Sequence, residues 1–287
     1  MTQTAAATDQ SAVIAEQVAA IADLLARGNV LVLTGAGIST DSGIPDYRGP
    51  DGTRRVTPMQ YAEFLGSSEA RQRYWARSYV GWQRFNKAQP NSGHQAVAAL
   101  QSHGMVGPVI TQNVDGLHQR AGATDVEELH GSLARVVCLT CGDRTSRWDL
   151  DDRMRESNPT YTVTSDEIRP DGDIVLNDLD VAAFRTPLCL VCGHDTLKPD
   201  VVFFGESVPK PLVEKCFRLT EEASALVVLG SSLKVMSGYR FVRRAAALDI
   251  PVAIITRGAT RGDAEATVQV DAPLAPTLEA LLVRLTA

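Results

Sequence analysis

Two glycines directly after a short apolar run are the first residues whose type and spacing suggest chemistry. Val30 to Leu33 are all apolar, and Gly35-Ala36-Gly37 follow after a single threonine. Such a run is typical of a parallel strand buried on both faces. Glycines at its end let backbone N–H groups approach an anionic phosphate. The pattern predicts a dinucleotide site opening a doubly wound domain, although a plain turn fits the two glycines as well.

A loop rich in helix-breaking residues follows these glycines, where a Rossmann unit would normally begin a long helix. Thr40 holds the position of the third glycine of the dinucleotide fingerprint. The loop carries Asp46, Tyr47 and Arg48. The arginine is available to a phosphate and the tyrosine to cover a ring. A ligand-covering loop and an ordinary surface loop are equally good interpretations of these residues alone.

Polar side chains end two later apolar runs. Asn113 and Asp115 follow one run, and His130 follows the next. The carboxyl ends of parallel strands meet at one edge of a sheet, where ligands bind in open α/β folds. An imidazole with an ordinary pKa of roughly 6.5 suits proton transfer at neutral pH. We therefore expect a functional role for Asn113, Asp115 or His130.

Four of the five cysteines form two Cys-x-x-Cys pairs, Cys138 with Cys141 and Cys189 with Cys192. This spacing is typical of a tetrahedral zinc site with four thiolate ligands. Such a coordination shell is closed, so the metal is expected to be structural. Disulfides are disfavoured because no sequence signal directs the chain to an oxidising compartment. The remaining Cys216 is expected to be a buried apolar residue.

The elements that position these residues follow from apolar periodicity. We expect strands at 30–33, 108–111, 126–129, 225–229 and 251–255, with a further β-prone run at 201–204. We expect helices at 11–26, 58–89, 92–102, 239–248 and 276–285. The fold class is α/β, a Rossmann-like doubly wound parallel sheet with a small zinc-binding domain and a helical lobe inserted. The predicted boundaries are 11–135 with 197–287 for the NAD-binding domain, about 53–90 for its helical insertion, and 136–196 for the zinc-binding domain.

Composition limits the class of protein further. The chain has 287 residues, 44% of them hydrophobic and 22% charged, and a net charge of −6. A negative charge argues against general nucleic-acid binding, and no direct nucleic-acid contact is expected. No apolar run is long enough to span a membrane. The N-terminal residues resemble neither a secretory signal nor a transit peptide, so a cytoplasmic location is expected.

Several of these motifs together resemble the sirtuin family. The matching segments are Gly-Ala-Gly-Ile-Ser-Thr-Asp-Ser-Gly-Ile-Pro-Asp-Tyr-Arg at 35–48, Thr-Gln-Asn-Val-Asp-Gly-Leu-His at 111–118, Leu-His-Gly-Ser at 129–132, both cysteine pairs, Pro-Asp-Val-Val-Phe-Phe-Gly-Glu at 199–206 and Gly-Ser-Ser-Leu at 230–233. Tyr47 and the stretches 72–77 and 237–241 are most similar to class II, the branch with the mitochondrial sirtuin four of animals. The resemblance favours a bacterial relative of that branch.

The resemblance implies an NAD-dependent protein lysine deacylase that uses NAD as co-substrate and one structural Zn²⁺. It implies His130 as general base, with Asn113 and Asp115 facing the nicotinamide and its ribose. It implies that NAD contacts Gly35, Ala36, Gly37, Ser39, Asp46, Tyr47, Arg48, Gln112, Asn113, Asp115, Gly230, Ser231, Ser232, Thr256, Arg257, Gly258 and Leu274. It implies that the acyl-lysine substrate of a protein partner contacts Val202, Phe204, Gly205, Met236, Ser237 and Gly238, with peptide backbone pairing as an added strand.

In the chemistry that this resemblance implies, the acyl oxygen of a modified lysine attacks C1′ of the nicotinamide ribose and expels nicotinamide. His130 takes a ribose hydroxyl proton, and that oxygen attacks the imidate carbon. Hydrolysis yields free lysine and O-acyl-ADP-ribose. Alternatives with the same cofactor are an ADP-ribosyltransferase, a non-catalytic NAD-sensing module and, less favoured because the third glycine is absent, a dehydrogenase.

Two departures from the family pattern leave the acyl preference open. Ser237-Gly238 stands where many relatives have Pro-Ala, so the peptide-pairing loop is expected to differ. Relatives that remove acidic acyl groups carry Tyr and Arg three residues apart near the tunnel. Tyr74 and Arg77 have this spacing, but the favoured register places Trp75 and Ser78 there.

Overall fold

The chain is organised around a six-stranded parallel sheet with the strand order β3-β2-β1-β7-β8-β9. A computed structural model describes residues 2–49 and 52–286. The strands are β1 (Val30–Thr34), β2 (Val106–Thr111), β3 (Val126–Glu128), β7 (Leu226–Leu229), β8 (Val252–Ile255) and β9 (Val268–Val270). Every residue of β1, β7 and β8 is buried, which confirms the interpretation of their all-apolar runs.

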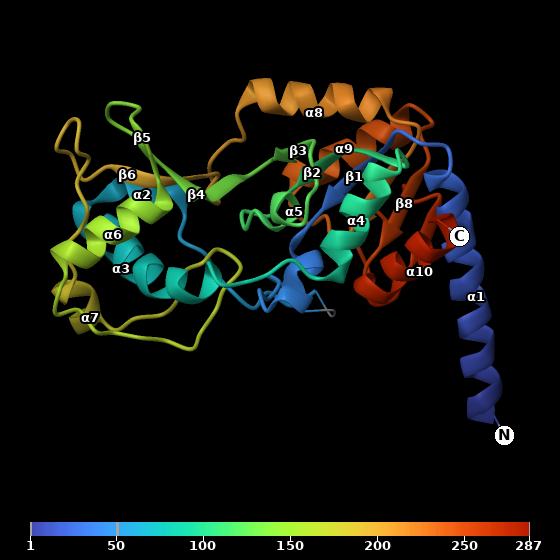
Figure 1. Cartoon of the computed structure of the whole chain (residues 1–287), viewed down its shortest axis with the longest axis horizontal. Helices are drawn as coiled ribbons and strands as arrows, with labels where there is room; N and C mark the ends of the chain where they lie inside the picture. The colour runs from blue at the N-terminus through green and yellow to red at the C-terminus, as the bar shows by residue number, and fades with distance from the viewer. Residues whose placement is uncertain (1, 50–51, 287) are drawn as a thin grey trace.

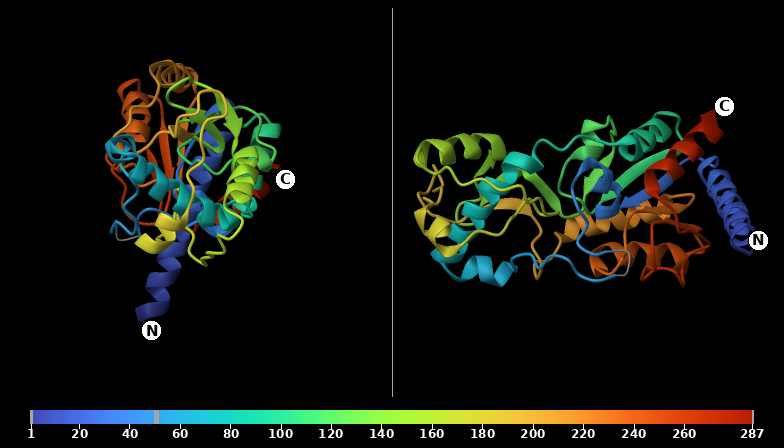
Figure 2. Two further views of the ribbon diagram at one scale, coloured as in Figure 1. Left: turned by 90° about the vertical axis from the view of Figure 1, so that its left-hand side faces the viewer. Right: turned by 90° about the horizontal axis from the view of Figure 1, so that it is seen from below.

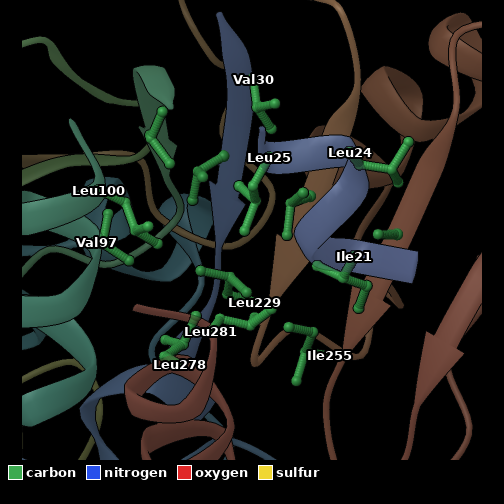
Figure 3. Packing of buried hydrophobic residues seen from close by; sticks show 14 of the residues in the cluster. Ile21, Leu24, Leu25, Val30, Val97, Leu100, Leu229, Ile255, Leu278 and Leu281 are labelled. Atoms are coloured by element: carbon green, nitrogen blue, oxygen red, sulfur yellow. The ribbon is translucent and has the colours of Figure 1, made fainter. Parts of the chain in front are cut away.

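Helices cover both faces of this sheet (Figure 1). On one face lie α1 (Thr2–Leu25), α4 (Ser92–Ser102) and α10 (Leu274–Thr286), and Figure 3 shows their apolar side chains packed against β1, β7 and β8. On the other face lie α8 (Lys210–Glu222) and α9 (Met236–Ala247), which bury Cys216 and Phe241. Alternate strand residues such as Val30 and Leu31 belong to opposite cores, as strand geometry requires.

A second, smaller unit lies beside the first (Figures 1 and 2). Its antiparallel sheet has the order β5-β4-β6, formed by β4 (Gly131–Cys138), β5 (Arg144–Ser146) and β6 (Leu197–Val201). Its helices are α2 (Tyr61–Gly66), α3 (Ser68–Phe85), α6 (Arg147–Ser157) and α7 (Asp178–Ala183).

The aromatic helices α2 and α3 build the core of this smaller unit. Phe64, Tyr74 and Trp75 belong to one buried cluster with residues of β4, α6 and β6, and this cluster also contains Cys138 and Cys189. The segment between the cysteine pairs therefore obtains from α2 and α3 the apolar area that its own sequence lacks. The stripe of aromatic residues is a packing surface, as its helical spacing indicated.

Several elements differ from the sequence-based expectation, among them the predicted helix 58–89, which is divided into α2 and α3 at Ser67. The β-prone run 201–204 is displaced, because β6 ends at Val201 and the chain then turns along the cavity described below. Helix α8, between β6 and β7, was not expected. Helix α1 starts earlier than position 11. The glycine turn leads into the short 3-10 helix η1 (Ala36–Ser42), and the short helix α5 (Leu117–Arg120) follows β2. None of the helices in the described part of the chain combines the length and apolarity needed to cross a membrane.

Candidate active site

A cavity of about 990 Å³ opens at the carboxyl edge of the parallel sheet and extends to the smaller unit. Nearly all of the predicted site residues line it. They are Gly35, Ala36, Gly37, Ser39, Asp46, Tyr47, Arg48, Gln112, Asn113, Asp115, His130, Val202, Phe204, Gly205, Gly230, Ser231, Ser232, Met236, Ser237, Thr256, Arg257 and Leu274. The parallel register explains this convergence, because β1, β2, β7 and β8 all end at one edge.

Two predicted residues, Gly238 and Gly258, do not line the cavity. Gly238 instead packs its backbone against a neighbouring side chain, since a Cβ there would lie 2.6 Å from the Gln112 Oε1 atom. Gly258 has a φ of +77°, and its N–H donates to Asp271 Oδ1 at 3.1 Å. Gly238 thus contacts the cavity wall through Gln112, whereas Gly258 is joined to the segment after β9.

The glycine turn brings backbone from β1 and β7 into close contact. Gly37 N donates to Gly230 O at 2.8 Å. A Cβ on Gly37 would lie 2.8 Å from that same oxygen, and one on Gly35 would lie 2.8 Å from Ser231 Cβ. A side chain at either glycine would force these backbones apart. The turn leads directly into η1, so Gly35, Ala36 and Gly37 line the cavity at the start of a helical segment, an arrangement that suits a phosphate.

The hydrogen-bond partners of its two ring nitrogens determine the tautomer of His130. Nδ1 lies 2.8 Å from Gln112 O, and Nε2 lies 2.8 Å from Ser237 Oγ. A carbonyl oxygen only accepts, so Nδ1 carries the proton and Nε2 keeps its lone pair. Burial lowers the pKa of His130, and the nearby Arg240 charge adds to this, while the Gln112 carbonyl opposes it. A neutral imidazole with an available nitrogen at a cavity wall is equipped to act as a base.

A second polar cluster joins η1 to the loop after β2. Ser39 Oγ donates to Asp115 Oδ2 at 2.7 Å and accepts from Asn113 Nδ2 at 3.0 Å. Asp115 Oδ1 accepts from Leu117 N at 2.9 Å. Burial raises the pKa of Asp115, although these hydrogen bonds oppose it. His94, which the sequence marked only as a helix residue, lies behind Ser39 with Nε2 at 3.5 Å from Oγ. The cluster offers amide and carboxyl groups to a polar ligand.

The loop after η1 lines the cavity with Asp46, Tyr47, Arg48 and Gly49. Arg55 pairs with Asp46 at 2.9 Å, and Arg48 Nη1 donates to Gly52 O at 3.1 Å. The Tyr47 ring meets the Phe204 ring edge-on, with centroids 5.8 Å apart. Burial raises the pKa of Tyr47 well above its usual value. The loop therefore supplies an aromatic cover and an arginine, as the ligand-covering interpretation expects.

The four paired cysteines form a separate cluster, and none of them lines the cavity. Their sulfur atoms all lie within 4.8 Å of one another. Cys138 Sγ is 3.6 Å from Cys192 Sγ, and Cys141 Sγ is 3.7 Å from Cys189 Sγ. These separations are too long for disulfides, whose sulfurs lie about 2 Å apart. They fit four thiolates around one Zn²⁺, for which Zn–S distances are about 2.3 Å. Cys216 is fully buried, as expected.

The smaller unit contributes Tyr74, which the favoured register set aside, and other cavity residues that the sequence did not indicate. Tyr74 of α3 lines the cavity, together with Asp171 and Asp173 from the segment between the cysteine pairs. Trp75, placed at the tunnel by the favoured register, is instead fully buried, and its Nε1 donates to Leu197 O at 2.8 Å. Ser78 is also buried away from the cavity. No pattern in the sequence around Asp171 predicts this placement, because only the tertiary fold brings that segment to the cavity.

The fold and its two sites together define a class, namely proteins in which a Rossmann-type sheet carries a cavity beside a small four-cysteine unit. The family model for the Sir2 family matches residues 35–237, which include the four paired cysteines and most of the residues that line the cavity. The chain belongs to the Sir2 family.

Known proteins that are similar to this chain over most of their length support this assignment. NAD-dependent protein deacetylase 1 of Streptomyces coelicolor is 56% identical over 268 residues, which cover 93% of this chain and 89% of that protein. The human NAD-dependent protein lipoamidase sirtuin-4, mitochondrial, is 45% identical over 238 residues, 82% of this chain and 76% of that protein. A solved structure of Sir2 with a p53 peptide and NAD⁺ has a TM-score of 0.71 and 30% identity, covering 91% and 95% of the two chains. The expected resemblance to bacterial and sirtuin-four-like proteins is confirmed.

Proposed function

We propose that this protein is an NAD-dependent protein lysine deacylase. The observation that carries the proposal is the single cavity that unites a phosphate-sized glycine turn, a carboxyl and amide cluster, and His130, whose unprotonated Nε2 faces Ser237 Oγ. A deacetylase relative at 56% identity and a lipoamidase relative at 45% support the same activity. The substrates of this proposal are NAD and acylated lysine side chains of proteins.

Each part of the cavity has a role in the proposal. The glycine turn with Arg48 holds the phosphates of NAD, and Thr256 after β8 and Leu274 at the start of α10 hold the adenosine half. Asn113 and Asp115 bind the nicotinamide and its ribose. The acyl-lysine enters between Val202 to Gly205 and the start of α9. The contacts in the free protein support these roles, because both sides of the entrance present backbone and apolar groups.

The proposed chemistry separates into two steps. The acyl oxygen displaces nicotinamide at C1′ of the ribose, and Tyr47 covers the ribose face after nicotinamide has left. His130 Nε2 then accepts a proton from a ribose hydroxyl, whose oxygen attacks the imidate carbon. Water completes the transfer, giving free lysine and O-acyl-ADP-ribose. The protonated imidazole that forms keeps its Nδ1–H bonded to Gln112 O.

Product analysis tests the proposal. An acetyl-lysine peptide and NAD are incubated with the protein, and nicotinamide, peptide mass and nucleotide products are followed together. We expect free lysine and O-acetyl-ADP-ribose in equal amounts with nicotinamide. An ADP-ribosylated protein would instead indicate an ADP-ribosyltransferase, and NAD binding without nicotinamide release would indicate a sensing module. Appearance of NADH would indicate a dehydrogenase.

The remaining expectations belong to this proposal as well. We infer that the four-cysteine cluster holds one structural Zn²⁺, supported by the sulfur separations and by the closed set of four thiolates. The predicted division into an NAD-binding domain and a zinc-binding domain at 136–196 remains a prediction, as do the cytoplasmic location and the lack of direct nucleic-acid binding.

A further inference from the structure

Two carboxyl groups in the cavity have no role in the proposed reaction. Asp171 and Asp173 line the cavity beside Tyr74. They belong to residues 170–173, here called the acidic segment, which lies between the two cysteine pairs in sequence. In the proposed function the acyl group occupies this same cavity, so the two carboxyl groups influence which acyl groups bind there. The inference that follows rests on the proposed function.

The acidic segment is fixed against helix α3. A Cβ on Gly81 of α3 would clash with the Gly172 carbonyl oxygen, so the two backbones are in direct contact. Gly172 has a φ of +67°, and a Cβ there would meet Leu133 Cδ1 at 3.0 Å. The next residue, Ile174, is fully buried in the aromatic core of the smaller unit. The segment has little room to carry its charges away from the cavity.

The basic groups near the acidic segment already have partners. Arg77 Nε lies 3.0 Å from Asp173 Oδ1 and also donates to the Ile174 carbonyl oxygen. Arg169 pairs with Glu167 at 2.5 Å. Arg54 is exposed, and its guanidinium lies 5.5 Å from the Phe204 ring centroid. These contacts leave Arg77 neutralised rather than available to an acidic ligand.

Among the residues that the structure describes, no ion pair joins Asp171 to a basic side chain, and Arg169 and Arg77 act on its carboxyl group only through longer-range attraction. Its Oδ1 accepts a hydrogen bond from Asp173 N at 3.3 Å. Burial raises the pKa of Asp171. Burial also raises the pKa of Asp173 to about 7; the nearby Arg77 favours ionisation of Asp173, and Asp171 disfavours it. The two acids also help to raise the pKa of Tyr74. This part of the cavity is thus already unfavourable for negative charge.

We propose that the acidic segment makes the cavity selective for uncharged acyl chains and excludes chains that end in a carboxylate. A carboxylate end would lose its hydration and meet Asp171, while Arg77 is occupied by Asp173. At an effective dielectric constant of about 20, two like charges 5 to 7 Å apart repel strongly enough to reduce reactivity at least about tenfold. A carboxamide end of the same size avoids this repulsion and donates hydrogen bonds to the acids.

Three peptides of one sequence test the proposal. They carry butyryl-lysine, succinyl-lysine and succinamoyl-lysine, the last being succinyl with its carboxylate replaced by a carboxamide. The full-length protein is assayed with NAD at pH 8, and kcat/KM is obtained from nicotinamide release. We expect succinamoyl and butyryl peptides to exceed succinyl by at least about tenfold. Equal kcat/KM for succinyl and succinamoyl would overturn the inference.

Variants of the acidic segment, with a matched control, test which carboxyl group causes the acyl selectivity. Asp171→Asn removes one negative charge from the cavity, and we expect the succinamoyl to succinyl ratio to fall at least about fivefold. Asp173→Asn should lower it further because Arg77 is released, and thermal unfolding reports whether this variant folds. Asp166→Asn is the control, since Asp166 is exposed, pairs with Arg84 and lies outside the cavity. An unchanged ratio in Asp171→Asn would overturn the inference even if Asp173→Asn does not fold.

The two proposals fail in different ways. If no acyl peptide causes nicotinamide release, the deacylase function itself is contradicted, and this inference with it. If nicotinamide release follows all three peptides equally, the deacylase function stands and only the selectivity is contradicted.

Discussion

At the scale of single residues, the hydrogen bonds of His130 determine which of its ring nitrogens can accept a proton. Gln112 O can only accept, so it holds the proton on Nδ1, and the 2.8 Å contact from Ser237 Oγ then leaves Nε2 as the acceptor. A ribose hydroxyl that replaced Ser237 Oγ as the hydrogen-bond partner of Nε2 would not require the ring to change tautomer. The ring is therefore already in the tautomer that its proposed role as base requires.

His130→Ala removes this base without touching the glycine turn. We expect kcat for deacylation to fall by a factor of about 10² to 10⁴, while the Kd for NAD changes little. Single-turnover kinetics and calorimetric titration with NAD measure the two quantities. His103→Ala, an exposed histidine outside the cavity, is the control and should keep full activity. A His130→Ala enzyme of normal kcat would contradict the assignment of the base.

The pH dependence of kcat/KM should show the lowered pKa of His130. The reactive form is the neutral ring, and burial lowers the pKa of that ring below 6.5. As the pH falls, the neutral form therefore persists below the ordinary histidine range, and the acid limb of the profile should lie below about pH 6.5. Initial rates are measured from pH 5 to 8, with far-ultraviolet circular dichroism to confirm folding. An acid limb above pH 6.5 would contradict the prediction.

Several residues that line the cavity could be predicted from the sequence because they directly follow predicted strands. Gly35, Asn113 and His130 each follow an apolar run, so the parallel sheet itself brings them together. Asp171 and Asp173 could not be found in this way. They lie in an irregular segment whose placement depends on packing against α3, and no local pattern encodes that packing.

At the scale of elements, the contact between α3 and the acidic segment has a measurable energy. Ala is favoured over Gly in a helix interior by about 1 kcal/mol, so propensity alone predicts that Gly81→Ala stabilises the protein. The new Cβ would clash with Gly172 backbone, and overpacking of this kind costs about 1 to 3 kcal/mol. We expect the clash to dominate and the free energy of unfolding in urea to decrease.

Gly66→Ala in α2 is the matched control for Gly81→Ala. Nothing lies within 4 Å of a Cβ at Gly66, which is exposed at the end of its helix. Only propensity acts there, so we expect a small increase in the free energy of unfolding or none. If Gly81→Ala behaves like Gly66→Ala, the proposed contact between α3 and the acidic segment is not tight.

Which elements could be predicted depends on how they are buried. The strands β1, β7 and β8 are covered on both faces, so their sequences are continuous apolar runs that are easy to find. Strands β4 and β5 carry polar residues such as Ser132 and Arg144 and are partly exposed, so they give no such signal. The run 201–204 is apolar because it faces the cavity, and this resembles the burial of a strand.

At the scale of the whole molecule, the smaller unit connects the metal cluster to the acyl side of the cavity. Cys138 and Cys189 belong to the same buried cluster as Tyr74, and Tyr74 in turn lines the cavity. The parallel sheet has its own cores, which contain none of the four paired cysteines. Loss of the metal should therefore affect acyl binding more than NAD binding.

Removal of zinc tests this connection. We expect one Zn²⁺ per chain by elemental analysis, and its removal by a chelator, or by Cys141→Ser, should lower the Tm and abolish deacylation. The physical reason is that a structural Zn²⁺ supplies much of the folding energy of a small unit. Titration with NAD should retain measurable binding, because the sheet and the glycine turn keep their own cores. Cys216→Ala is the control and should retain one Zn²⁺, since Cys216 lies buried in α8 on the sheet. Full deacylase activity without zinc would show that the cluster does not maintain the acyl side of the cavity.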